Sequence, residues 1–194
     1  MLNENEGIND FEGFNCNNHI FTELTVCGKN FQDTLLFKPP KDLIDCSIAQ
    51  RRSINLLTRR IHGIDWNSGF YPYSFVNEYF VSLRIRFPKV TVFVKGKNKA
   101  QFLSKYLENV RDLEDFGCPP IKEIQKGFVV SCPNHSQIEP WKPEVKFWHC
   151  SKLKAALLYQ WLEKFKYRNP DGDQSDVFNV NSSFECLHVS SNKQ

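Results

Sequence analysis

The sequence lacks any long apolar run. No stretch of the 194-residue chain approaches the roughly 20 apolar residues that a membrane helix needs. The first residues, MLNENEGINDFEGFN, are polar and acidic, unlike a signal peptide. We therefore expect no membrane association and a location inside the cell, in the cytoplasm or the nucleus. No internal repeat is present either.

A strong charge of one sign is also lacking. The chain has 25 basic and 22 acidic residues, a formal net charge of +3 and a pI near 8.4, which permits an acidic partner such as RNA without demanding one. Its seven cysteines are an odd number, and disulfides are not expected inside the cell. Metal ligation or burial is the expected use of these thiols. The 41% of hydrophobic residues suffice for one globular domain.

The sequence pattern predicts an α/β domain over residues 18–167, between a flexible tail at 1–17 and a disordered tail at 168–194. Alternation over residues 19–30 indicates a strand that ends in a turn, and the β-branched run 90–96 indicates a strand buried on both faces. Short strands are also expected at 34–40 and 109–115, and helices at 47–62, 73–87, 98–108, 118–124 and 151–167. This order implies a central mixed sheet flanked by helices.

Candidate metal ligands occur near the last predicted helix. Cys132 and His135 have a spacing that lets a short loop bring both side chains to one ion, and Cys150 or its neighbour His149 is a third candidate. A tetrahedral zinc site needs a fourth ligand, for which Glu23 is the best candidate because a carboxylate in an apolar strand needs a partner. Alternatively, Glu23 faces solvent from an edge strand and the cysteines are core residues.

The order of several short segments resembles that of a known family. The segments are TEL, FKPP, RRIHGIDW, VFVKGKNKAQFL, VRDLEDFGCPPIKEI, CPNH and ALLYQWL, and together they resemble the Maelstrom-type domain and related transposon-associated proteins over about residues 19–165. These proteins are offshoots of the DEDDh (DnaQ-like) exonucleases. The resemblance implies an RNase H-like fold and a structural zinc site formed by a Glu-Cys-His-Cys set, which matches Glu23, Cys132, His135 and Cys150.

The same resemblance implies that hydrolysis has been lost. A DEDDh exonuclease holds two divalent ions with four acidic residues, the first two in an Asp-x-Glu motif on the first strand. FTELT keeps Glu23 but has Phe21 in place of the aspartate, VFVKGKNKAQFL has no acid, and HCSKLKAALL has His149 but lysines such as Lys154 instead of an acid. We therefore predict no catalytic residues. Asp112, Glu114 and Asp115 are interpreted as a solvated loop.

The resemblance then implies a binding function in RNA- or transposon-related, piRNA-like processes, with single-stranded RNA or a protein as partner. Candidate phosphate contacts are Arg51, Arg52, Arg59, Arg60, Lys95, Lys97 and Lys99, and the aromatic residues Trp66, Phe70, Tyr71 and Tyr73 are candidates for stacking on bases. The alternatives are a solvated helix face with core aromatics, a residual nuclease that uses His149, Asp112 or Glu114, and a protein-binding scaffold with Phe70, Tyr71 and Trp141 exposed.

Overall fold

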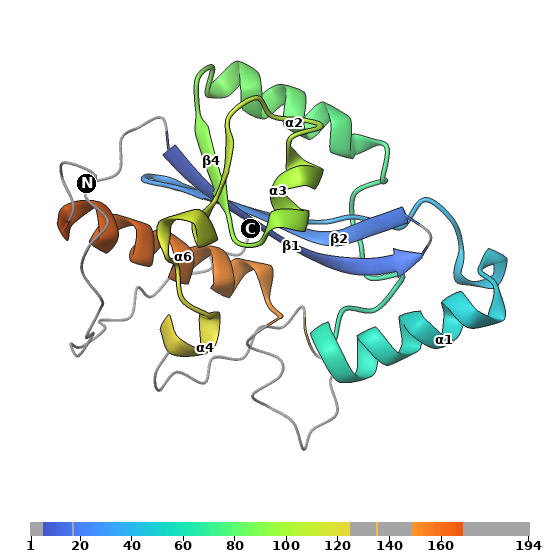
Figure 1. The fold of residues 1–194 in the computed structure, drawn as a ribbon. Helices are drawn as coiled ribbons and strands as arrows, with labels where there is room; N and C mark the ends of the chain where they lie inside the picture. The colour runs from blue at the N-terminus through green and yellow to red at the C-terminus, as the bar shows by residue number, and fades with distance from the viewer. Residues whose placement is uncertain (1–5, 17, 125–134, 136–148, 169–194) are drawn as a thin grey trace, which may run out of the picture.

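A five-stranded mixed sheet forms the centre of the molecule, with the strand order β3-β2-β1-β4-β5 (Figure 1). The central strand β1 (Glu6–Cys16) pairs antiparallel with β2 (Asn18–Gly28), which pairs antiparallel with β3 (Phe31–Leu36). On its other side β1 pairs in parallel with β4 (Thr91–Val94), and β4 with β5 (Val110–Asp112). The predicted α/β class with a mixed sheet flanked by helices is confirmed.

The computed structural model describes residues 6–16, 18–124, 135 and 149–168. Cys132 and the predicted tail beyond residue 168 lie outside these ranges. Within them, no helix combines the length and the apolar composition that crossing a bilayer requires.

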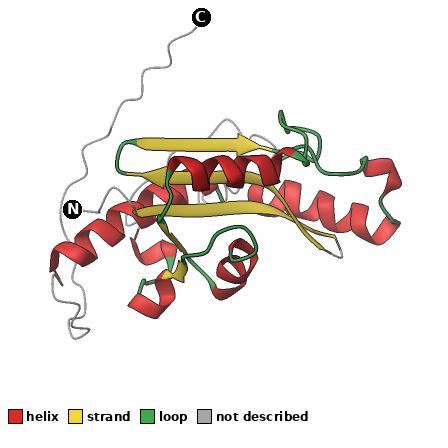
Figure 2. Ribbon diagram, turned by 90° about the horizontal axis from the view of Figure 1, so that it is seen from above, coloured by secondary structure: helices red, strands yellow, loops and turns green. Residues whose placement is uncertain are grey.

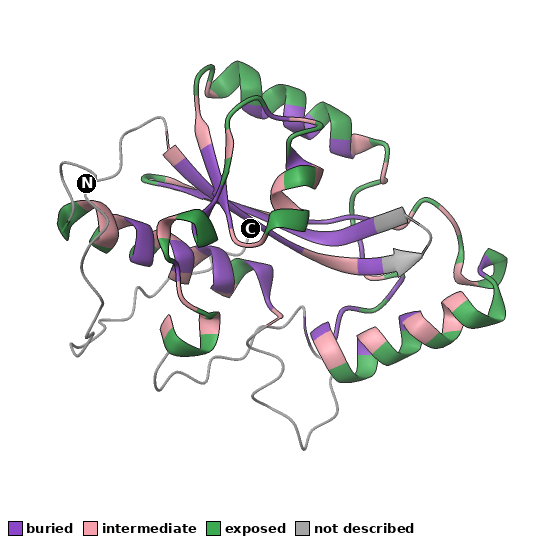
Figure 3. Ribbon diagram, viewed as in Figure 1, coloured by how far each residue is buried: buried purple, intermediate pink, exposed green. Residues whose placement is uncertain are grey.

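The prediction that residues 1–17 form a tail is wrong, because Glu6–Cys16 is the central strand of the sheet. Its side chains alternate between the two faces. Ile8 packs against one group of helices and Phe11 against the other, and both are buried. Much of the central strand is buried in the same way (Figure 3). Polar residues between these positions hide the alternation in the sequence. The burial of Asp10 is compensated by Lys99 and Lys154, whereas the buried Asn9 side chain has no hydrogen-bond partner among the described residues.

Helices cover both faces of the sheet, as the view from above shows (Figure 2). One face packs against α2 (Phe75–Arg86) and α3 (Lys97–Leu103) through a core that includes Phe21, Leu24, Phe80 and Leu103. The other face packs against α6 (Ser151–Arg168), whose Leu158 and Leu162 contact the core around Ile8 and Phe93. Shorter helices are η1 (Leu43–Asp45), η3 (Leu113–Phe116) and α4 (Ile121–Ile124).

Helix α1 (Ile48–Leu57) lies beside the C-terminal end of β1 and the N-terminal end of β2, and it continues into a π-helix, η2 (Thr58–His62) (Figure 1). Ser47 caps α1 by accepting from the Gln50 backbone, and the Gln50 side chain accepts from the Ser47 amide, which forms a capping box. The predicted helix over 47–62 is therefore present, but its last turn is wider than an α-helix. A π-turn of this kind often marks a functional site, and here it presents His62 to the interior.

Candidate metal centre

The register of the two longest strands brings two carboxylates together. Glu12 of β1 lies directly opposite Glu23 of β2, so both side chains point to the face that α6 covers. Immediately beyond this pair the register shifts, because Gly13 pairs with Phe21 and Thr22 is left as the extra residue of a β-bulge. Bulges redirect side chains and are common beside functional sites.

Glycine is required at position 13 by the closeness of the bulge. A Cβ atom at Gly13 would lie 2.1 Å from the Ile20 carbonyl oxygen and 2.4 Å from the Phe21 Cα. These are backbone atoms that cannot rotate away, so any larger residue would push β1 from β2 beside Glu12 and Glu23. The local sequence therefore helps to fix the spacing of the two carboxylates.

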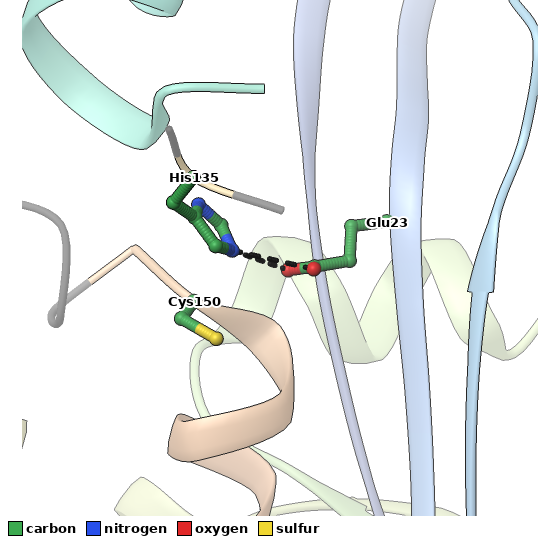
Figure 4. Close-up of side chains that lie close together, drawn as sticks. All are labelled: Glu23, His135 and Cys150. Carbon is green, nitrogen blue, oxygen red and sulfur yellow. Dashed lines mark hydrogen bonds and ion pairs between the residues drawn. The ribbon is translucent and has the colours of Figure 1, made fainter. Parts of the chain in front are cut away.

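Glu23, His135 and Cys150 converge at this end of the sheet and could hold a metal ion (Figure 4). Their ligand atoms, a carboxylate oxygen, an imidazole nitrogen and a thiol sulfur, all lie within 4.8 Å of one another. All three residues are fully buried. Three donors of these types, withdrawn from water and pointing at a common centre, are the arrangement that a transition-metal ion requires.

The hydrogen bonds of His135 indicate which nitrogen faces the centre. Nδ1 lies against the His62 carbonyl oxygen, which can only accept, so Nδ1 is the donor. Nε2 lies 3.2 and 3.3 Å from the two Glu23 carboxylate oxygens. An unprotonated nitrogen and a carboxylate repel each other at that distance unless a cation, either a proton or a metal ion, neutralises them. In a metal-bound histidine the ring nitrogen that does not face the ion usually donates to a carbonyl or carboxylate oxygen, and Nδ1 of His135 has such a partner.

Glu23 remains ionised in spite of its burial. Desolvation by itself would raise the pKa of this carboxyl, but the hydrogen bond and charge of His135, together with hydrogen bonds from Ser151, bring the pKa below its ordinary value. The Ser151 amide donates to Glu23 Oε2 at 2.8 Å. Ser151 begins α6, so the carboxylate lies at a helix N-terminus, where the helix dipole favours negative charge. Cys150 directly precedes this helix and shares the same field.

The side chain of His62 is a structural group and not a candidate base. Its Nδ1 accepts from the Ile64 amide at 3.0 Å, and its ring packs edge-on against Phe14. Burial lowers the pKa of His62 to about 4, with nearby Glu12 opposing that shift, so the ring is neutral at pH 7. The contribution of His62 to the site is its carbonyl oxygen, which the π-helix directs at His135.

The structure distinguishes between the two candidates at the start of α6. Cys150 faces Glu23 and His135, whereas the Nδ1 atom of His149 lies 3.9 Å from Glu12 Oε2 and its side chain is 33% exposed. Adjacent residues point in different directions, so they serve different neighbours. The remaining predicted ligand, Cys132, lies outside the described residues.

A second charged cluster was missed by sequence reasoning. The predicted Asp-x-Glu position at Phe21-x-Glu23 is on β2, whereas β1 carries Asp10 and Glu12 in that very pattern. Lys154 of α6 makes ion pairs with both carboxylates, and Lys99 of α3 lies 2.6 Å from Asp10. The Asp-x-Glu pattern is present in the sequence, but it lies in the segment that was interpreted as a tail.

The predicted phosphate-binding residues have different surroundings. Arg52, Arg59, Arg60 and Lys97 are exposed and Arg51 is half-buried. Within the part of the chain that the structure describes, no carboxylate forms an ion pair with any of these five. In contrast, Lys95 donates to the Cys118 carbonyl and Lys99 donates to Asp10 and to the Phe11 carbonyl. These two lysines are engaged within the chain, and the prediction of phosphate contact does not fit them.

The other predicted surface residues divide in a similar way. Phe70 is 78% and Tyr71 42% exposed, but Trp66 is buried and donates to the Lys41 carbonyl. Tyr73 packs within the core cluster around Phe21. Of the acidic residues after β5, Glu114 and Asp115 are exposed as predicted. Asp112 is buried instead, because its carboxylate accepts from the Gly96 and Glu114 amides.

Comparison of the chain with protein-family models, curated proteins and solved structures finds no match.

Proposed function

We propose that this chain forms a zinc-stabilised, non-hydrolytic RNase H-like domain that binds single-stranded RNA. The observation that carries the proposal is the convergence of Glu23, His135 and Cys150 in the interior. The strand order has β1 at the centre, β2 antiparallel to β1, β3 antiparallel to β2, and β4 and β5 parallel to β1, and this topology supports the RNase H-like assignment. The family resemblance of the sequence motifs supports it independently.

Zinc suits the donor set. A thiolate and an imidazole select zinc over the hard ions Mg²⁺ and Ca²⁺, which take oxygen ligands. The three donors are fully buried, and Cys132 is the proposed fourth ligand. A closed four-ligand site without room for water is structural and not catalytic. The ion would join β2, the start of α6 and the segment containing His135.

RNA binding is supported by the exposed cations of the α1–η2 helix. Arg52, Arg59 and Arg60 project from it, and η2 itself provides the His62 carbonyl beneath the metal centre. Arginines held on a rigid helix can contact successive phosphates without reading sequence. Exposed Phe70 and Tyr71 are available to stack on unpaired bases. The small net charge of +3 implies modest, salt-sensitive affinity.

The metal half of the proposal is tested by elemental analysis of the purified chain. We expect about one zinc per chain, lost in Cys132→Ser and Cys150→Ser. Cys46→Ser is the matched control, because Cys46 is a buried thiol that packs against α1 and is not among the converging donors. Equal zinc contents in all three variants would overturn the assignment of the ligands.

The RNA half is tested by fluorescence anisotropy with labelled single-stranded RNA over a range of salt concentrations. Replacing both Arg59 and Arg60 by serine should weaken binding and lower the slope of log K against log salt by about 1.4, since each phosphate contact to a single strand contributes about 0.7. The control is Lys29→Ser with Lys89→Ser. This variant removes the same amount of charge from exposed turns. Lys29 follows the C-terminal end of β2, whereas α1 packs near Ile20 at the opposite end of that strand.

Two results would reject RNA binding. One is the absence of binding at low salt, and the other is an equal loss in the arginine and lysine variants. Association with a protein that survives nuclease treatment would then favour the scaffold alternative, for which exposed Phe70 is the first residue to replace.

A further inference from the structure

Four charged side chains form a compact cluster around β1, beside the candidate metal centre but including none of its three residues. Asp10 and Glu12 are two positions apart on the strand and point to the same face. Lys154 reaches them from α6, with its Nζ 2.9 Å from Asp10 Oδ2 and in contact with Glu12 Oε1. Lys99 reaches them from α3, with its Nζ 2.6 Å from Asp10 Oδ1 and 3.7 Å from Glu12 Oε1.

The topology of the sheet creates the place for this cluster. β4 pairs with β1 only as far as Ile8, so beyond this residue the edge of β1 that faces β4 has no strand partner among the described elements. The Lys99 ammonium fills part of that edge by donating to the Phe11 carbonyl at 2.7 Å. α3 follows β4 directly, which positions Lys99 at the point where the strand order reverses. Such points are the usual ligand sites of open α/β sheets.

The cluster is buried and electrically balanced. Side-chain exposure is 2% for Asp10, 14% for Glu12, 10% for Lys154 and 24% for Lys99. Burial alone would raise the pKa of Glu12, but the charges of Lys154 and Lys99 hold it well below its usual range. Burial would also lower the pKa of Lys154, but Asp10 and Glu12 raise it above its usual value. Glu12 and Lys154 are therefore both charged at neutral pH.

A carboxylate pair of this spacing, on the first strand of such a sheet, is what two divalent ions need in the exonucleases that the sequence resembles. The residues around it here do not fit those ions. Mg²⁺ binds carboxylate oxygens at about 2.0–2.1 Å, and the Lys154 ammonium already lies within hydrogen-bond distance of both carboxylates. A dication that entered would have to displace the ammonium groups or meet their positive charge at close range.

We propose that Lys99 and Lys154 occupy, as covalently attached cations, the positions at which Asp10 and Glu12 would otherwise hold divalent metal ions. The site is thereby closed to Mg²⁺ and Mn²⁺. This assignment extends the non-hydrolytic character proposed above, and it does not depend on zinc or RNA binding. The proposal also differs from a simple stabilising ion-pair network. In such a network, removing the two lysines would not create a site that binds a divalent ion.

The test replaces both lysines by methionine, which keeps an unbranched apolar stem and removes the charge. With the zinc centre saturated, Mn²⁺ binding is followed by electron paramagnetic resonance and by thermal unfolding. The Lys99→Met, Lys154→Met variant should bind Mn²⁺ at least about tenfold more tightly than the wild type and should be stabilised by it. The wild-type unfolding temperature should not respond to Mn²⁺.

Two controls locate the effect. Adding Asp10→Asn to the double variant should abolish the gained Mn²⁺ binding, because it removes a carboxylate of the cluster. Lys95→Met removes a lysine that is held by the Cys118 carbonyl and Glu114 instead, and it should leave Mn²⁺ binding at the wild-type level. Should the double variant not fold without metal, refolding in Mn²⁺ but not in buffer alone supports the proposal as well.

Three outcomes would overturn the proposal. The first is a folded double variant that binds Mn²⁺ no better than the wild type. The second is wild-type protein that binds Mn²⁺ in a manner sensitive to Asp10→Asn. The third is a double variant that stays unfolded in Mn²⁺ and whose single variant Lys154→Met, when folded, gains no Mn²⁺ affinity. None of these outcomes bears on zinc content or RNA binding, so failure here is distinct from failure of the proposed function.

Discussion

Glu12 and Glu23 are direct cross-strand partners, yet each carboxylate is neutralised by a different set of groups. Glu12 is bound by Lys154 and Glu23 by His135. Like charges directly opposite each other in a sheet are destabilising, so each carboxylate needs positive charge beside it: Lys154 supplies it to Glu12, and a proton or metal ion held on His135 would supply it to Glu23. Two chemically distinct centres, one suited to a metal ion and one filled by lysine, therefore share one face of the β1–β2 ladder.

The division between these centres predicts different effects of removing each carboxylate charge. Glu23→Gln should weaken zinc binding by at least about tenfold, a lower bound taken from the effect of altering groups around a metal. Glu12→Gln should leave zinc affinity near the wild-type value, because Glu12 is engaged by Lys154 and Lys99. Competition with a chelating dye measures both affinities. A comparable loss in the two variants would show that the carboxylates act as one site.

The bulge beside this pair predicts an unusual requirement for glycine. Gly13→Ala places a methyl group against backbone atoms of Ile20 and Phe21, and we expect a loss of about 2–3 kcal/mol in the free energy of unfolding. Zinc affinity should fall as well, since Glu23 shifts with the strand. Gly117→Ala is the control. Gly117 has a φ of +74° but no atom within 4 Å of the added Cβ, so this variant should cost about 1–2 kcal/mol without affecting zinc.

Chemical denaturation and dye competition on the same samples compare these glycine variants. Equal stability losses, or a zinc affinity that is unchanged in Gly13→Ala, would contradict the role assigned to the bulge.

Strong local patterns in the sequence were sufficient to predict most of the elements. Alternation over 19–30 and the β-branched run over 90–96 correspond to β2 and β4, and the predicted helix over 151–167 corresponds to α6. β1 was not predictable from local pattern, because Asn9 and Asp10 are buried and Glu12 is half-buried. The cationic partners of Asp10 and Glu12 are distant in sequence, with Lys99 89 residues from Asp10 and Lys154 142 residues from Glu12.

The candidate site was likewise predictable only in part. Glu23 was identified because a carboxylate in an apolar strand is anomalous, and the structure brings it to His135 and Cys150. The choice between His149 and Cys150 depended on the direction of each side chain at the start of α6, which spacing does not determine. The contact of the His62 carbonyl with His135 Nδ1 depends on a π-turn, for which the sequence has no recognisable signal.

A pair of buried hydroxyl groups should link the sheet to α6 independently of the metal. Thr25 of β2 and Ser151 of α6 lie 2.8 Å apart through their side-chain oxygens, and Thr25 also contacts the Thr34 hydroxyl at 3.0 Å. In a double-mutant cycle with Thr25→Val and Ser151→Ala, we expect a coupling energy of about 0.5–1.5 kcal/mol. Urea denaturation of the four proteins measures it, and additive effects would show that the hydroxyls do not interact.

Alkaline pH should destabilise the fold through Cys27, which lies on β2 beneath α6. Burial raises the pKa of this thiol from 9.0 to about 11, with Glu163 adding to the effect. The folded chain therefore keeps the thiol neutral, while the unfolded chain ionises it above about pH 9. Stability from this group is complete below that pH and is lost progressively as the pH rises toward 11.

We expect this loss to be about 1–2 kcal/mol, less than the full shift implies because the thiol keeps some solvent access. The free energy of unfolding in urea at about pH 8 and about pH 10.5 measures it. Cys27→Ala should show a shallower decline over this interval. Cys46→Ala, which truncates a different buried thiol, retains Cys27 and should keep the wild-type slope. If the Cys27→Ala slope equals that of the wild type, the alkaline loss must come from other groups, of which Cys118 is the next to replace because burial raises its pKa to about 12.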